Sequence, residues 1–232
     1  VNDLNLRGVS GPVRFLLTDA TYPTETFPIT VNVSGPAPTA VNTVTIKPNT
    51  GVTSTVSGAS ASGPIFKIFG TNYVTIDGSN ALAGTTRDLT IENTSTTSPN
   101  VVVFGSNGTT PIVGGALKHC VVRNGALTSS AVVIGDGTTI GNAGWFSNME
   151  VRNCQIEKAF IGVYANGGTT PQQGASLTYA DNTLTTSGAN AIRLVGLYMQ
   201  GVNGATVSNN TIGNFDVVDA ENDMGIWLAT GT

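Results

Sequence analysis

The sequence predicts an all-β fold, a right-handed parallel β-helix in which the chain coils and each coil pairs with the next. Three observations support this fold. A six-residue unit recurs at intervals of 29, 28 and 28 residues, at residues 122–127, 151–156, 179–184 and 207–212. A short apolar strand recurs between these units, starting at Val101, Ala131, Ile161, Ile192 and Ile226. Between the strands there is no helical stretch, so the chain lacks the helical crossovers of an ordinary parallel sheet.

Each recurring unit has the pattern of a short strand followed by a corner. Before the corner, apolar residues such as Val151 and Tyr179 alternate with residues such as Arg152 and Thr178, which is typical of a half-buried strand. A column of Asn and Asp follows, at Asn124, Asn153, Asp181 and Asn209. Asn and Asp tolerate left-handed backbone and hydrogen-bond to turns, so we expect a structural column. Contact with a ligand is the alternative.

The two ends of the chain differ from the repeats. Residues 1–43 lack the recurring columns, and we interpret them as an N-terminal cap, with residues 44–232 forming the coils. The chain stops just beyond an apolar strand with no cap, so we expect a solenoid truncated at its C-terminal end. The register of the earliest coils is open. Either Ile76 or Ile91 occupies the Val122 column, and we favour Ile76 with an inserted loop.

Composition limits the partners. The chain has 232 residues, a net charge of −4 and ten scattered Lys and Arg, which argues against nucleic acid or an anionic membrane. There is no run of eighteen apolar residues, so we expect no transmembrane segment. Cys120 and Cys154 fall in different predicted columns, and we expect two buried free thiols that are not bonded to each other.

The predicted coils resemble the right-handed parallel β-helices of the pectin-lyase-like superfamily. Residues 73–78 and 89–94, followed by the Asn columns, are most similar to the β-helix repeats of large secreted surface proteins of Bacteroidetes-type bacteria. Residues 8–15 are similar to the start of such a repeat region. The resemblance covers nearly the whole chain. It implies an extracellular or cell-surface location, and members with this pattern are mostly assigned no activity.

Carboxylates are the first candidates for chemistry, because enzymes on this fold use them for Ca²⁺ or as acid–base pairs. The candidates are Asp77, Asp88, Asp136, Asp181, Asp216, Asp219, Glu221 and Asp223. The first four fall in different coils and columns. The last four cluster, and we interpret them as a solvated loop, with an oxygen-ligated Ca²⁺ site as the alternative. One His and two Cys in separate columns do not make a zinc site, so we expect no other metal or cofactor.

Two further features have a functional and a plain interpretation. Arg123 and Arg152 are predicted in one outward column on adjacent coils, roughly 5 Å apart, which would suit an acidic sugar. We prefer two solvated arginines held by Glu92 or Glu150. His119 is the single histidine, and the pattern places no nucleophile beside it.

The second strand of each coil supplies the candidate ligand site. We place Val101 and Val103 inside, with the equivalent residues of later coils, so the opposite parity faces outward and is unusually apolar. The anchors of a platform for sugar rings or a neighbouring domain are then Phe104, Tyr164 and Trp227, with Arg193 as the polar contact. Two alternatives remain open. The Gly-Thr-Thr loops after these strands cover the strip, or a parity shift of one residue buries the aromatics.

Together these patterns favour a non-catalytic extracellular module, a stalk or adhesin that binds carbohydrate or neighbouring domains of the same chain. The alternative is a carbohydrate-active enzyme, a polysaccharide lyase or glycoside hydrolase acting on an acidic polysaccharide.

Overall fold

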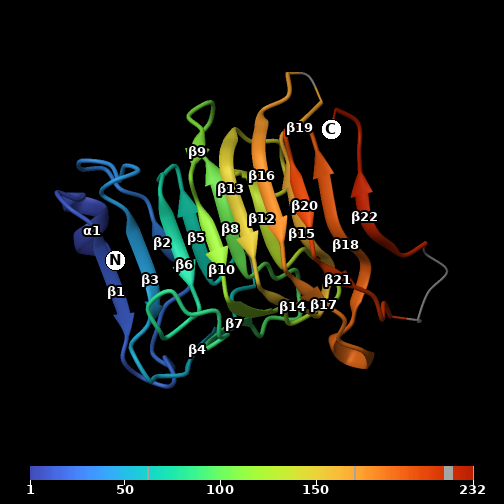
Figure 1. Cartoon of the computed structure of the whole chain (residues 1–232), viewed down its shortest axis with the longest axis horizontal. Coiled ribbons are helices and arrows are strands. Elements are labelled where there is room, and N and C mark those ends of the chain that lie inside the picture. The colour runs from blue at the N-terminus through green and yellow to red at the C-terminus, as the bar shows by residue number, and fades with distance from the viewer. Residues whose placement is uncertain (62, 170, 217–221, 232) are drawn as a thin grey trace.

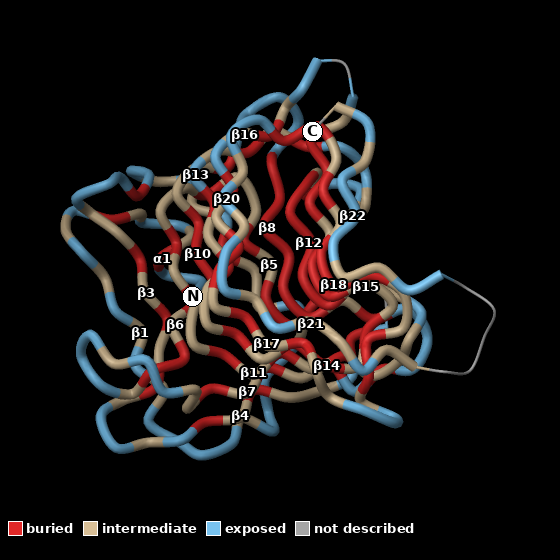
Figure 2. The backbone as a smooth tube through the Cα atoms, turned by 45° about the vertical axis from the view of Figure 1, so that its right-hand side comes forward, coloured by how far each residue is buried: buried red, intermediate tan, exposed pale blue. Residues whose placement is uncertain are grey.

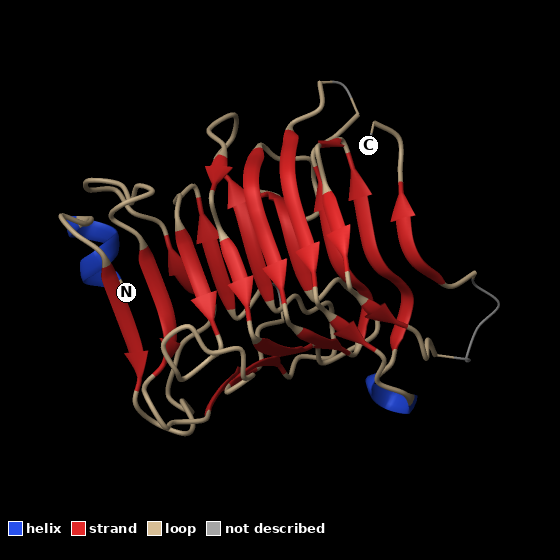
Figure 3. Cartoon of the chain, in the orientation of Figure 1, coloured by secondary structure: helices blue, strands red, loops and turns tan. Residues whose placement is uncertain are grey.

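The computed structural model describes residues 1–61, 63–169, 171–216 and 222–231 and shows a parallel β-solenoid of about seven coils (Figure 1). Three parallel sheets run along the stack, and almost no helix is present (Figure 3). The predicted parallel β-helix is confirmed. Among the described residues, no helix is long and apolar enough to cross a membrane.

The three sheets form the sides of the solenoid. Sheet A contains β1 (Val13–Leu17), β3 (Val44–Pro48), β6 (Val74–Asp77), β9 (Ile112–Val113), β10 (Ala116–Lys118), β13 (Phe146–Arg152), β16 (Gly174–Ala180), β19 (Val202–Asn203) and β20 (Thr206–Ser208). Sheet B contains β4 (Ser54–Gly58), β7 (Leu89–Asn93), β11 (Cys120–Arg123), β14 (Gln155–Glu157), β17 (Thr183–Leu184) and β21 (Thr211–Ile212). Sheet C contains β2 (Ile29–Val31), β5 (Phe66–Phe69), β8 (Val102–Ser106), β12 (Val132–Asp136), β15 (Ala159–Asn166), β18 (Ile192–Gln200) and β22 (Met224–Leu228).

From the second coil on, each coil passes through sheet A, then B, then C. The third coil is β6, β7 and β8, the fourth is β10, β11 and β12, the fifth is β13, β14 and β15, and the sixth is β16, β17 and β18. Neighbouring strands are paired in register, and the spacing of such a ladder is roughly 4.8 Å. Equivalent side chains of successive coils therefore form columns along the axis.

Residues 1–43, the predicted cap, contain one helix and two strands of the stack. Helix α1 (Asn2–Arg7) lies at the N-terminal end and buries Leu4 (Figure 1). Strand β1 pairs with β3 from Val13 opposite Val44 to Leu17 opposite Pro48, and β2 pairs with β5. The strand pairing therefore continues across the boundary predicted at residue 43.

The interior is filled by apolar columns, one or two from each sheet. Buried segments follow the strands, and exposed segments follow the corners and loops (Figure 2). The inner column of sheet A contains Ile46, Ile76, Leu117, Val151 and Tyr179, and that of sheet B contains Val56, Ile91, Val122, Ile156 and Leu184. Stacking of such columns excludes water along the whole axis and is the main stabilising contribution of a solenoid.

The structure corrects the register of the first repeat unit. Val151 lies opposite Leu117 in sheet A, whereas Val122 lies in sheet B, opposite Ile91 and Ile156. The Val122 column therefore contains Ile91, and the preference for Ile76 is wrong. The reason is a local ambiguity, since residues 117–119 and 122–124 both read apolar, basic, polar.

The loop between β6 and β7 reaches across the corners of later coils. Arg87, in the third coil, donates from Nε to the carbonyl oxygen of Asn153 at 2.9 Å and from Nη2 to Asn153 Oδ1 at 3.0 Å. The same Nη2 donates to Thr183 Oγ1 at 3.2 Å. One side chain thus joins the third coil to the fifth and the sixth.

Candidate functional site

The outer face of sheet C carries a column of aromatic side chains. Tyr164 of β15, Tyr198 of β18 and Trp227 of β22 are paired in register. The rings of Tyr164 and Tyr198 are stacked, with centroids 4.8 Å apart and an interplanar angle of 16°. Tyr198 and Trp227 meet edge to face at 5.3 Å and 75°. Both geometries are favourable for aromatic pairs, so the column stabilises its own arrangement.

The size of the side chains changes abruptly along this column. Towards the N-terminal end, the positions in register with Tyr164 are Val133, Val103 and Lys67. Tyr164 therefore stands above a much smaller residue. Because one of its faces is covered by Tyr198, its other face is directed along the axis, over Val133.

A groove of about 250 Å³ lies at this step. Its lining consists of Asn100, Thr128, Ser129, Ser130, Val133, Ile140, Gly141, Phe160, Ile161 and Tyr164. Thr128, Ser129 and Ser130 come from the corner before β12, while Ile140 and Gly141 come from the loop after it. The groove thus has an apolar wall, which includes an aromatic face, and a polar rim of hydroxyls and an amide. This combination is typical of small-molecule sites.

A buried asparagine holds the tyrosine in place. Asn166 is 8% exposed, and its Nδ2 donates to Tyr164 Oη and to the carbonyl oxygen of Gly141, both at 3.1 Å. Its Oδ1 accepts a hydrogen bond from the amide of Gly168 at 2.9 Å. Asn166 therefore links the ring to the loop that forms the opposite wall of the groove. No sequence pattern indicates this role, because Asn166 precedes two glycines and resembles a turn residue.

Both phenols of the column are neutral near physiological pH. Burial raises the pKa of Tyr164, and the neighbouring Tyr198 raises it further. Burial also raises the pKa of Tyr198. A neutral ring with an intact hydroxyl is therefore the form that faces the groove.

The structure separates the four residues predicted to bind a ligand. Phe104 is 0% exposed and lies in the core, so its predicted exposure is wrong. Its neighbours Val102 and Val132 also face inward, while Val103 and Val133 lie on the outer side, buried there. The parity of these two strands is shifted by one residue because every position in them is apolar, and alternation cannot define a face.

The other three predicted residues lie on or next to the outer face. Tyr164 lines the groove, and Trp227 is 40% exposed at the far end of the column. The guanidinium of Arg193 lies over the ring of Phe160, 5.4 Å from its centroid. Phe160 is itself a groove residue. Tyr198, which completes the column, is absent from the prediction because the sequence register stops at Val195.

The outer face of sheet A is charged instead of aromatic. Lys118 Nζ and Arg152 Nε each lie 2.6 Å from a carboxylate oxygen of Glu150, and Arg152 Nη1 lies 2.6 Å from Asp181 Oδ2. His119 Nδ1 lies 2.7 Å from Asp77 Oδ1. Burial alone would raise the pKa of Glu150, but hydrogen bonds from Lys118 and Arg152 outweigh it and lower the pKa. The carboxylates of Glu150 and Asp181 thus neutralise the basic side chains of Lys118 and Arg152 on this face.

The predicted stacking of Arg123 on Arg152 is wrong, because Val122 and Val151, which begin their repeat units, lie in different sheets. Arg123 is in sheet B and Arg152 is in sheet A, so they are not stacked. Arg123 Nε lies 2.8 Å from Glu157 Oε2 and its Nη1 lies 3.7 Å from Glu92. Arg152 is held by Glu150, as the plain interpretation predicts.

The predicted Asn and Asp column is a column of left-handed corner residues. Asn153, Asp181 and Asn209 have φ angles of +49°, +60° and +55°, and His119, at +54°, is the equivalent residue of the fourth coil. Asn209 Nδ2 donates to Asp181 Oδ1 at 3.2 Å. Asn124 does not belong here. It is buried at the next corner, where its Nδ2 donates to the carbonyl oxygens of Pro99 and Ser129.

A second, inner column lies beside the first. Cys120 and Cys154 occupy the same position on adjacent coils, because Lys118 pairs with Arg152 two residues earlier. The prediction of different columns is wrong, whereas both cysteines are free, as expected. Asn182 and Asn210 continue the column, with the amide of Cys154 donating to Asn182 Oδ1 at 2.9 Å and the amide of Asn182 to Asn210 Oδ1 at 3.0 Å.

Metal ligation has little support within the described ranges. No group of three or more His, Cys, Asp or Glu side chains there could hold a metal ion. Of the predicted carboxylate cluster, Asp219 and Glu221 lie outside the described residues, so the Ca²⁺ alternative stays a prediction.

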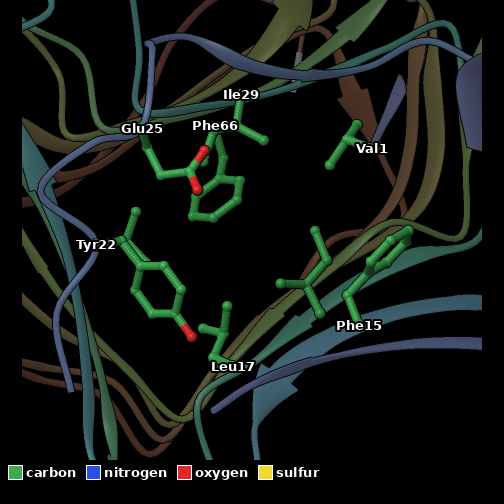
Figure 4. Close-up of a pocket in the computed structure, with 9 residues that line it drawn as sticks. Val1, Phe15, Leu17, Tyr22, Glu25, Ile29 and Phe66 are labelled. Atoms are coloured by element: carbon green, nitrogen blue, oxygen red, sulfur yellow. The ribbon is translucent and has the colours of Figure 1, made fainter. Parts of the chain in front are cut away.

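Another hollow lies at the N-terminal end of the stack, beside Val1 (Figure 4). Its wall includes Phe15, Leu17, Ile29 and Phe66, which belong to the core or pack against it. Tyr22 and Glu25 supply its polar groups. The hollow is the end of the solenoid interior, and its chemistry is less specific than that of the groove beside Tyr164.

Comparison with known proteins adds no identity, since no family model, curated protein or solved structure matches the chain.

Proposed function

We propose that the chain is a non-catalytic β-helix module of a secreted or cell-surface bacterial protein, a stalk or adhesin that binds carbohydrate on the outer face of sheet C. The observation that carries this proposal is the groove beside Tyr164, where an aromatic face meets a rim of neutral hydroxyl and amide groups. The C–H groups of a sugar ring are attracted to the negative face of an aromatic ring, and its hydroxyls need hydrogen-bonding partners.

The extracellular part of the proposal has a separate basis. It rests on the resemblance of the repeats to the pectin-lyase-like β-helices of large surface proteins of Bacteroidetes-type bacteria. The parallel β-solenoid is the architecture that this resemblance requires. A long, regular solenoid also suits a stalk, because its length grows with the number of coils.

A glycan-binding screen tests the proposal. The purified chain is applied to an array of neutral and acidic glycans, and binding is compared with that of Tyr164→Ala. We expect Tyr164→Ala to lose about tenfold in affinity, because the stacking face is removed. Tyr22→Ala, at the opposite end of the stack, is the matched control and should bind like the parent. A parent chain that binds no glycan contradicts the proposal.

The same material tests the enzyme alternative. Pectin, alginate and other uronates are incubated with the chain, with and without Ca²⁺, and product absorbance is followed. Formation of unsaturated products would identify a polysaccharide lyase and replace the non-catalytic proposal.

A further inference from the structure

The stacking of the aromatic column limits how a sugar can meet it. Tyr198 has one face against Tyr164, and the edge-to-face contact with Trp227 occupies its other side. The faces of the Tyr164 and Tyr198 rings therefore point along the solenoid axis. The column does not present a flat aromatic platform to the solvent. The face of Tyr164 over Val133 is the aromatic surface that remains for a ligand.

The position of this face closes the groove at one end. Tyr164 blocks the groove in the direction of β15 and β18, while the residues in register on the other side, Val133 and Val103, are small. Ile140 and Gly141 border one flank, and Ser129 and Ser130 border the other. The groove is thus bordered by Tyr164 at one end and by these two segments on its flanks, above the buried side chain of Val133.

The polar groups of the groove are uncharged. Its ten lining residues include no Asp, Glu, Lys, Arg or His. Asn100 donates from Nδ2 to the carbonyl oxygen of Ser130 at 2.7 Å, so its amide is held at the rim. A carboxylate brought into such a groove would lose hydration without an opposite charge in the lining to replace it.

We infer that the groove binds the terminal residue of a neutral glycan chain end-on, with its ring against the free face of Tyr164 and its hydroxyls against Asn100 and Ser129. This inference rests on the proposed carbohydrate-binding function and makes it more specific. The rest of the glycan chain extends away from the faces of Tyr164 and Trp227. Asn166 acts as a positioning residue, because it fixes the hydroxyl of Tyr164 and the loop at Gly141.

The experiment uses calorimetric titration of the whole chain with neutral oligosaccharides of glucose, galactose and mannose, one to six residues long, and with galacturonate oligomers of equal length. We expect the affinity of a neutral series to reach its plateau at about two residues, because the closed end accepts one ring. Tyr164→Ala should weaken binding about tenfold, whereas Trp227→Ala should leave it within about twofold.

A second variant tests the inference even if Tyr164→Ala fails to fold. Val133→Phe fills the floor of the groove and leaves the aromatic column intact, so binding should be lost. Val121→Phe, on the outer face of sheet B, is the matched control and should bind normally. Circular dichroism and melting temperature establish that both variants are folded.

The other outcomes contradict either the end-on inference or the proposed carbohydrate-binding function. Affinity that rises steadily with chain length, together with equal losses for Trp227→Ala and Tyr164→Ala, would mean that the glycan lies across the column. Tighter binding of galacturonate oligomers would exclude a neutral ligand. In both cases the proposed function survives and the end-on inference fails. If neither series nor any glycan on the array binds, the proposed function itself is wrong.

Discussion

The outer faces of sheets A and C are built on the same ladder but differ in what they leave for a partner. On sheet A, Lys118 and Arg152 are in register on adjacent coils, and each lies 2.6 Å from Glu150, two residues before Arg152. On sheet C, Tyr164 and Tyr198 stack at 4.8 Å, and the column then steps down to Val133. A carboxylate next to two stacked basic side chains satisfies both of them, whereas a change in side-chain size exposes a ring face. The candidate site therefore arises where the aromatic column of sheet C ends, at the step from Tyr164 to Val133.

The largest effect should come from the corner that supports the charged column, and not from its charges. We expect Asn153→Ala to lower the free energy of unfolding by about 2–3 kcal/mol, because alanine disfavours the φ of +49° and two side-chain hydrogen bonds are lost. Arg152→Ala should cost less than about 1 kcal/mol, because its ion pairs are partly exposed. Urea denaturation measures both.

Asn153→Gly is the control for this prediction. Glycine keeps the left-handed backbone and loses the hydrogen bonds, so its cost should fall between those of the two alanine variants. Equal losses of stability for Asn153→Ala and Arg152→Ala would count against a structural role for the corner.

On sheet C, Tyr198→Ala should have the next largest effect. It removes one stacked and one edge-to-face contact, which together stabilise the fold by about 2 kcal/mol. Tyr198→Phe retains both contacts and loses the hydrogen bond from Oη to Gln200 Oε1, so its cost should be about 1 kcal/mol or less. Thermal unfolding of the two variants gives the comparison. A larger loss in Tyr198→Phe than in Tyr198→Ala would show that the hydroxyl, and not the ring, stabilises the column.

The smallest expected effect is a pH dependence that distinguishes the two faces. The pKa of Glu150 is lowered in the fold from an ordinary value of 4.5, so its carboxylate stabilises the protein above that value. The contribution is lost as pH falls through the lowered pKa. Glu150→Gln should therefore be less stable than the parent at pH 7, by less than about 1 kcal/mol, and the difference should shrink on acidification.

Tyr164→Phe provides the sheet C counterpart. Its phenol has a raised pKa, so the stability difference from the parent should be constant between pH 7 and pH 3. Denaturant titrations at four pH values measure both variants. A constant difference for Glu150→Gln would mean that its ion pairs add nothing to stability.

The sequence predicts the elements of the fold well where two kinds of residue alternate. Met149 to Arg152 and Leu177 to Ala180 alternate in polarity, and the structure buries Met149, Val151, Leu177 and Tyr179 as expected. Residues 101–104 and 131–133 are uniformly apolar and are buried on both sides. Such a strand contains no information about which side faces the interior, so the position of Phe104 could not be predicted.

The candidate site could be predicted only in part for a related reason. Tyr164 and Trp227 are aromatic residues in recurring strands, but they occupy the fourth and the second position of the predicted copies, so spacing does not reveal that they share a column. A bulge between Ala159 and Ile161 shifts the pairing with β18, so Tyr198 enters the column from a position that a fixed period does not reach. Asn166 acts through burial and three hydrogen bonds, which no local pattern encodes.

The reach of Arg87 changes how the stack should come apart. If each coil touched only its neighbours, coils could fray one at a time from either end. Arg87 spans from the third coil to Asn153 in the fifth and Thr183 in the sixth, so opening the sixth coil also breaks a contact anchored three coils away. We therefore expect the third to sixth coils to open together, and a load along the axis to be shared across these coils through Arg87.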